Sequence, residues 1–218
     1  PSQYYHARGR GNSPSDFLYT LVDGDDLLPD LALGRLAVSS SGAAAQTVDR
    51  IIRYDTDIES GDWRSRVIYL ANQHDKGIFT EPSNALARNY TEPFGLESVK
   101  IYNPENTDTP NATGGAFLEA LNQGSLMVNF AGHGSANFMQ FVFSVIPDWG
   151  SLGRIRNGRK LPLVLALSCL NGMFVIPTVD AVSEALTTMG EGGAIAYISA
   201  SAQSFVAQND LLSDTMYR

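Results

Sequence analysis

The sequence predicts an α/β fold, with a mostly parallel sheet that is flanked by helices on both faces. Three observations favour it. Short apolar runs that are typical of strands alternate with longer amphipathic runs, which is the βαβ pattern. Two of the apolar runs, at 125–132 and 161–168, are nearly continuous, as in strands buried on both faces of a parallel sheet. The chain has 218 residues, 44% of them apolar, enough for a sizeable core.

The N-terminal part is expected to contribute two strands and a crossover helix. The segments FLYTLV at 17–22 and LALGRLAV at 31–38 have strand-like composition, and Gly34 interrupts the second. Apolar residues recur with a helical period over 43–58, and Ser41 with Gly42 supplies a start signal. His6 lies in an extended N-terminal segment to which we assign no role.

The remaining elements are predicted to alternate along the chain. They are a strand at 66–72, a helix at about 84–90, a strand at 97–103, a helix at 116–124, strands at 125–132 and 161–168, a helix at 179–189 and a strand at 192–199. Gly124 suits a left-handed helix cap. The strands at 125–132 and 161–168 should lie at the centre of the sheet.

Composition restricts the function classes. A formal net charge of −8 and a pI near 4.8 disfavour binding to nucleic acid or to anionic membranes, and without an apolar run of about 18 residues we expect no membrane insertion. The single cysteine excludes an internal disulfide and a multi-cysteine metal site. We expect no cofactor.

The DGDD segment at 23–26 spaces carboxylates like a calcium loop but lacks the closing glutamate, so we favour a solvated acidic turn and keep a structural calcium ion as the alternative.

The candidate chemistry lies at two strand ends. Cys169 follows the apolar run LPLVLALS, and His133 follows SLMVNFAG. Active sites of open α/β sheets form beyond the carboxyl ends of the strands, so a thiol and an imidazole would meet there. Taken alone, Cys169 is more typical of a buried small residue, and His133 of a loop histidine bonded to backbone. Their occurrence together at matching positions favours a cysteine nucleophile with a histidine partner.

Further residues are candidates for parts of the same cysteine–histidine site. The amides of Gly134 and Cys169 are candidates for an oxyanion hole. Asp75, in the loop after the strand at 66–72, is a candidate to orient His133, with an ordinary solvated acid as an equal alternative. Ala131 and Leu167 lie two positions before His133 and Cys169, so they would line the substrate pocket or simply pack in the core. His74 is a rival that we place on the surface.

The chain resembles the gingipain-type cysteine peptidases, family C25 of the caspase-like clan. The clan pattern is similar to NFAGHG, an apolar strand ending in His-Gly, and to LVLALSC, a later strand ending in Cys. Segments more specific to the gingipain-like group are LLPDLALGRLAV at 27–38, SCLNGMF at 168–174 and DAVSEALTTMGEGGAIAYISAS at 180–201. The likeness covers most of the chain from about residue 16.

The resemblance implies a caspase-like, gingipain-like fold and a cysteine endopeptidase that acts through a Cys169 acyl-enzyme, with His133 as acid and base. It implies an N-terminal segment of a partial subdomain at 1–60 and a catalytic subdomain at 61–218. A polypeptide substrate, further domains of the same precursor, and a secreted or cell-surface bacterial location follow from it. Basic specificity in gingipains needs an acid in the pocket, and none of the candidate acids stands out: Glu81, Asp180 and Asp210.

Two alternatives belong to other classes. A catalytically inactive caspase-like scaffold, or a component of a secretion or sorting system, would keep His133 and Cys169 without using them. A nucleotide-binding domain is disfavoured, because neither GxGxxG nor a P-loop follows the first strand.

Overall fold

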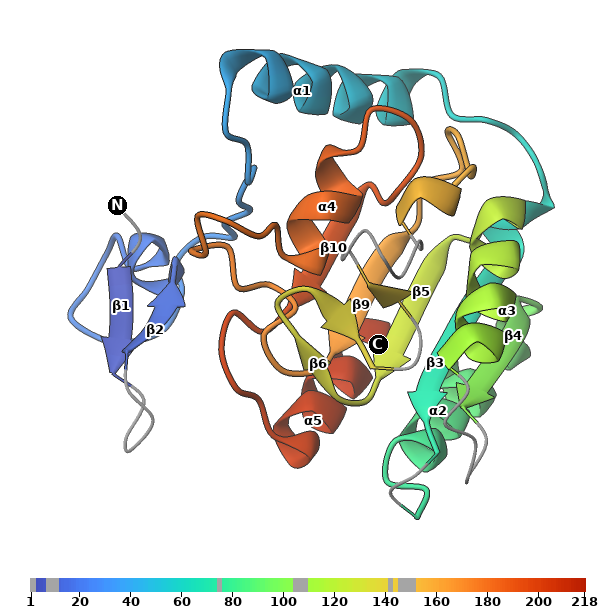
Figure 1. Cartoon of the computed structure of the whole chain (residues 1–218). Coiled ribbons are helices and arrows are strands. Elements are labelled where there is room, and N and C mark those ends of the chain that lie inside the picture. The colour runs from blue at the N-terminus through green and yellow to red at the C-terminus, as the bar shows by residue number, and fades with distance from the viewer. Residues whose placement is uncertain (1–2, 7–11, 74–75, 104–109, 141–142, 145–151) are drawn as a thin grey trace.

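A five-stranded parallel sheet forms the centre of the molecule (Figure 1). The computed structural model describes residues 3–6, 12–73, 76–103, 110–140, 143–144 and 152–218. The strand order is β10-β9-β5-β3-β4, and every neighbouring pair is parallel. The strands are β3 (Arg66–Asn72), β4 (Glu97–Asn103), β5 (Met127–Ala131), β9 (Leu163–Leu167) and β10 (Ala196–Ser199). This arrangement confirms the predicted α/β fold with a parallel sheet.

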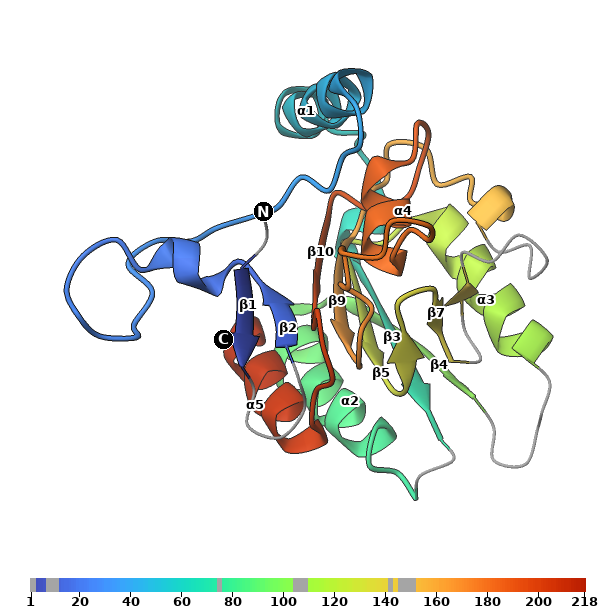
Figure 2. The ribbon, with the colours of Figure 1, turned by 60° about the vertical axis from the view of Figure 1, so that its left-hand side comes forward.

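Helices cover both faces of the sheet (Figures 1 and 2). On one face, α3 (Pro110–Gln123) and α4 (Val182–Thr188) pack on inward side chains that include Ile68 and Val128. On the other, α2 (Thr80–Leu86) and α5 (Val206–Tyr217) contact the side of the sheet that carries Val67 and Tyr69. Successive side chains of β3 therefore pack into the cores on opposite faces of the sheet, and all but its first residue are buried.

Smaller elements surround this sheet. An antiparallel hairpin joins β1 (Gln3–His6) to β2 (Asn12–Ser15), and a three-stranded antiparallel sheet follows β5. Its strands are β6 (Gly134–Ser135), β7 (Phe138–Met139) and β8 (Phe143–Ser144). Short 3₁₀ turns cover Phe17–Thr20, Asp62–Ser65, Glu92–Phe94 and Leu152–Arg154. The β1–β2 hairpin, β6 to β8 and α5 were not anticipated from the sequence.

Most predicted elements of the sheet are confirmed. The strands expected at 66–72 and 97–103 have these bounds, and β5 and β9 are the central pair with β3 beside them. Gly124 adopts a φ of +93° after α3, as expected for a left-handed cap. The helix α3 begins at Pro110 and so includes a segment expected to be turns, which fits the preference of proline for a first helical turn. The helix expected at 84–90 begins earlier, at Thr80, and continues as a π-helical turn over Ala87–Thr91.

The two strands predicted near the N-terminus are wrong. Residues 17–20 form a 3₁₀ turn, and residues 31–38 follow an irregular path. Side chains satisfy part of the backbone here instead of a neighbouring strand: the Asp30 carboxylate accepts from the amides of Val22 and Asp23 at 2.8 and 3.0 Å. Arg35 donates twice to Asp16 at 2.6 Å. Apolar composition without a strand partner therefore did not produce strands.

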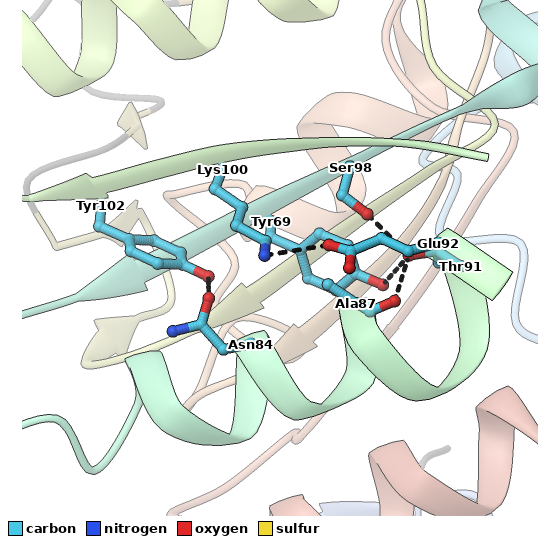
Figure 3. Close-up of polar contacts among 8 residues, drawn as sticks. All are labelled: Tyr69, Asn84, Ala87, Thr91, Glu92, Ser98, Lys100 and Tyr102. Atoms are coloured by element: carbon cyan, nitrogen blue, oxygen red, sulfur yellow. Dashed lines mark hydrogen bonds and ion pairs between the residues drawn. The ribbon is translucent and has the colours of Figure 1, made fainter. Parts of the chain in front are cut away.

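A polar cluster fastens the π-helical turn to the sheet (Figure 3). The buried Thr91 hydroxyl donates to the Ala87 carbonyl at 2.9 Å and lies 2.7 Å from Ser98 on β4. Nearby, the Tyr102 hydroxyl donates to Asn84 at 3.0 Å, and burial raises the pKa of Tyr102 to about 12. The phenol thus keeps its proton, and the α2 face of the sheet is fixed by hydrogen bonds as well as by packing.

The helix α1 (Ser41–Thr56) stands apart from the sheet and reaches it through α4 (Figure 2). The Ser40 side chain caps its start by accepting from Ala43. Its half-buried Arg50 donates to three carbonyls in the last turn of α4 and just before β10: those of Leu186, Thr187 and Ala194, at 3.4, 3.1 and 3.1 Å. A cation at the carbonyl end of a helix also suits the helix dipole. Arg50 is therefore the main polar link between α1 and the sheet domain.

Replacing Arg50 should lower the stability of the folded protein. We expect Arg50→Met to lower the free energy of unfolding by about 1.5 to 3 kcal/mol, because charged hydrogen bonds to three backbone carbonyls are lost. The matched control is Arg53→Met on the same helix. Among the residues that the structure describes, the Arg53 side chain pairs only with the exposed Asp49 one turn away, so its loss should change stability by no more than about 0.5 kcal/mol. Urea denaturation compares the two variants, and equal losses would contradict the role given to Arg50.

Candidate active site

The carboxyl ends of β5 and β9 bring the two predicted reactive residues to one edge of the sheet. Ala131, the last residue of β5, pairs with Leu167, the last residue of β9. His133 and Cys169 each follow two residues later. The side chains of Ala131 and Leu167 are buried, whereas His133 is exposed and Cys169 is partly exposed. The reactive groups thus lie at the solvent edge of a rigid core.

His133 is held through its backbone. Its amide donates to Oδ1 of Asn72, the last residue of β3, at 2.9 Å. Its imidazole meets the ring of Phe79 edge to face, with centroids 5.3 Å apart. Neighbouring strand ends on β3 and β5 therefore fix where the histidine leaves the sheet, and its ring retains access to solvent.

The sulfur of Cys169 contacts Ser204, in the segment between β10 and α5. The Ser204 amide donates to Sγ at 3.4 Å, its hydroxyl lies 3.9 Å from Sγ, and Sγ donates to its carbonyl at 3.6 Å. Asn209 on α5 donates to the Ser204 hydroxyl at 3.0 Å. Sequence reasoning missed Ser204, and its remote position gave no signal for it.

The loop after Cys169 has a special backbone conformation. Leu170 adopts a φ of +65°, in the left-handed region that a branched side chain seldom occupies. The amides of Leu170 and Gly172 donate to the carbonyls of Ala202 and Ala200, each at 3.0 Å. The segment that follows β10 therefore holds the cysteine loop in this conformation.

Two buried asparagines connect the three strand ends. Asn72, at the end of β3, bonds the first residue of the hairpin that follows β5, and Asn171 in the cysteine loop bonds the same hairpin from the other side. Sequence reasoning missed both. The available signal was their position: Asn72 ends the buried strand β3, and Asn171 lies four residues after the end of the buried strand β9.

The other predicted site residues fall in several places. Gly134 begins β6 and pairs with Met139. Asp75 and His74 lie outside the described residues. Arg35, in the gingipain-like segment at 27–38, stacks on the ring of Phe174, with its guanidinium 4.2 Å from the centroid. The candidate specificity acids are scattered: α2 contains Glu81, Asp180 precedes α4, and α5 contains Asp210, whose pKa is raised by burial.

In the described part of the chain, no group of three or more His, Cys, Asp or Glu side chains could hold a metal ion. In the acidic turn, the Asp26 carboxylate accepts from the Leu28 amide at 2.8 Å. The same part of the chain contains no helix long and apolar enough to cross a membrane.

Curated relatives with similar sequences are gingipains. Gingipain R2 of Porphyromonas gingivalis is 24% identical over 193 residues, which cover 82% of this chain and 24% of the relative. Gingipain R1 of the same species is also 24% identical, over 82% of this chain and 18% of the relative. The chain thus spans about a quarter or less of the relatives it matches.

Solved structures show the same fold. The crystal structure of the Arg-specific cysteine proteinase gingipain R superposes with a TM-score of 0.81 at 23% identity, over 94% of this chain and 48% of that one. A complex of gingipain pro- and mature domains from Porphyromonas gingivalis gives 0.79 at 25% identity, with the same coverage. The family model for peptidase family C25 matches residues 1–218. Since that match extends over the whole chain, the protein belongs to peptidase family C25.

Proposed function

We propose that the protein is a cysteine endopeptidase in which Cys169 is the nucleophile and His133 its acid and base. One observation carries the proposal: the in-register pairing of Ala131 with Leu167 puts the two residues at equivalent places beyond adjacent parallel strands. Membership of family C25 supports a polypeptide substrate. Family resemblance also supports an exported bacterial location, partner domains of the same precursor, and a catalytic subdomain at 61–218.

The proposed cycle has two steps. The Cys169 thiolate attacks the carbonyl carbon of the scissile peptide, a C–S bond forms, and the C–N bond breaks as the His133 imidazolium gives its proton to the leaving amine. A water molecule then attacks the thioester, His133 takes the proton of that water, and the C–S bond breaks to release the carboxylic acid. The Ser204 amide stabilises the returning thiolate.

Two amides are proposed to bind the oxyanion, those of Gly134 and Cys169. In the part of the chain that the structure describes, the Cys169 amide has no protein acceptor, which supports this role. Asp75 is proposed to orient the imidazole of His133. Ala131 and Leu167 are proposed to form the floor of the substrate pocket, since they end the strands directly beneath the reactive residues.

Covalent labelling tests the nucleophile. We expect a panel of peptidyl acyloxymethyl ketones with Arg, Lys or small residues at P1 to label the full-length protein at Cys169. Cys169→Ala should abolish labelling, and His133→Ala should slow it about 100-fold to 10,000-fold, as for loss of a general acid–base catalyst. Mass spectrometry of the Cys169 peptide measures the product, and the reactive P1 class assigns specificity.

The control is the simple alkylating reagent iodoacetamide, which reacts with an accessible thiol whether or not it is activated. A folded protein that reacts with iodoacetamide but with none of the peptidyl ketones would contradict the peptidase proposal and favour an inactive scaffold. Thermal unfolding of both variants establishes that they are folded.

Gly134 offers a test of the oxyanion site. A Cβ at this position would lie 2.8 Å from the Ser168 hydroxyl and 3.0 Å from the Asn171 side chain, so Gly134→Ala must shift the backbone here or these two buried side chains, and we expect the backbone amide to move. We expect kcat for a peptide substrate to fall by about 100-fold or more, with KM little changed, as when an oxyanion donor is lost. Gly190→Ala is the control, because a Cβ there meets nothing within 4 Å. An unchanged kcat in Gly134→Ala would remove Gly134 from the site.

A further inference from the structure

We propose that Asn72 and Asn171 are positioning residues for the reaction, which hold His133 in register with Cys169 by binding the hairpin at 133–140 from two sides. The inference rests on the proposed function of the two reactive residues. In the sheet, β5 lies between β3 and β9. The hairpin continues β5, and one asparagine reaches it from each flanking strand end.

Asn171 binds the tip of the hairpin. Its Nδ2 donates to the carbonyls of Ser135 and Phe138 at 2.5 and 2.9 Å, and its Oδ1 accepts from the Ser168 hydroxyl at 2.6 Å. Its side chain is completely buried. Ser168 directly precedes Cys169, so one amide group connects the cysteine loop to the hairpin. Hydrogen bonds of this length in a dry environment fix geometry strongly.

Asn72 binds the base of the hairpin. Its Oδ1 accepts from the His133 amide at 2.9 Å, and its Nδ2 donates to the Gln140 carbonyl at 3.1 Å. His133 and Gln140 also bond each other, since the Gln140 amide donates to the His133 carbonyl at 2.9 Å. Asn72 is only 1% exposed. Both strands of the hairpin are therefore tied to the end of β3 at the point where the histidine emerges.

The backbone is built around these two amides. A Cβ at Gly132 would lie 1.9 Å from Oδ1 of Asn72, and one at Gly134 would lie 3.0 Å from both polar side-chain atoms of Asn171. The residues on either side of His133 thus lack side chains where the two asparagine amides approach. A displacement of a reacting group by about 1 Å can cost about 100-fold in rate, so this fixation bears directly on catalysis.

A merely structural role is the competing explanation, and the chain contains a matched control. Asn157 is also buried, at 3% exposure, and its amide also bonds backbone groups: it donates to the carbonyls of Lys160 and Gly193 at 2.9 Å and accepts from the Gly193 amide at 2.8 Å. It precedes β9, so it lies at the opposite, amino-terminal edge of the sheet. Its loss should affect stability but not the reaction.

The experiment compares Asn171→Ala, Asn72→Ala and Asn157→Ala in the full-length protein with a peptide substrate that the wild-type protein cleaves. We expect kcat to fall about 100-fold in the first two variants while KM stays within about 3-fold. In Asn157→Ala both constants should stay within about 3-fold of wild type, although all three variants unfold at lower temperature. Hydrogen exchange of peptides over 133–140 should rise in the first two variants only.

A second variant, Asn171→Asp, keeps nearly the same side-chain size and shape, so a change in its kcat does not come from a large change in packing. Its carboxylate would face the Ser135 and Phe138 carbonyls, whereas the protonated carboxyl regains one donor, so burial beside these oxygens should favour the protonated form. As pH falls, kcat expressed as a fraction of wild type at the same pH should therefore recover by about 10-fold. Asn157→Asp should show no such recovery.

The outcomes are distinguishable. If Asn171→Ala and Asn72→Ala keep kcat within about 3-fold while they lose stability as Asn157→Ala does, the asparagines are structural and the inference is wrong. A pH-independent fraction for Asn171→Asp contradicts it as well. If the wild-type protein cleaves nothing and Cys169 resists the peptidyl ketones, the proposed function fails, and the inference falls with it.

Discussion

In-register parallel pairing of β5 with β9 decides where the two candidate reactive residues, His133 and Cys169, lie. The strands are buried on both faces, so their side-chain alternation and their ends are fixed by the core. If β9 shifted by one residue along β5, its buried side chains would point to the opposite faces of the sheet, and Cys169 would move relative to His133. The proposed catalytic geometry is therefore specified by the same apolar packing that stabilises the sheet, and the loops beyond the strands only refine it.

The sequence was sufficient to predict the sheet and its central strands, because β3, β5 and β9 are apolar runs whose period and length leave little choice of structure. It also predicted that His133 and Cys169 follow the ends of β5 and β9, as they do. It was not sufficient for the contacts around them. Ser204 reaches the sulfur of Cys169 from 35 positions along the chain, and Asn171 bonds a hairpin 33 to 36 positions away. Such contacts depend on tertiary packing rather than on local pattern.

In the N-terminal region, the sequence predicted strands at 17–22 and 31–38 that did not form. Residues 31–38 have the composition of a strand, but strand formation requires a partner for the backbone and a surface to bury the side chains. Leu33 and Leu36 remain about half exposed. The segment is held by polar contacts, those of Asp30 and Arg35, and its helix α1 reaches the sheet domain through Arg50. Local composition predicted a structure here that the surrounding packing does not support.

The glycines on either side of His133 have a consequence for how this family is interpreted. Both are required by the close approach of buried amides, from Asn72 at Gly132 and from Asn171 at Gly134, and neither requirement involves a bond being broken in a substrate. A descendant that lost its nucleophile would still be selected to keep the glycines, because its hairpin would still have to fold. Preservation of a Gly-His-Gly signature among relatives thus reports intact architecture, and the state of the cysteine is the better marker of surviving activity.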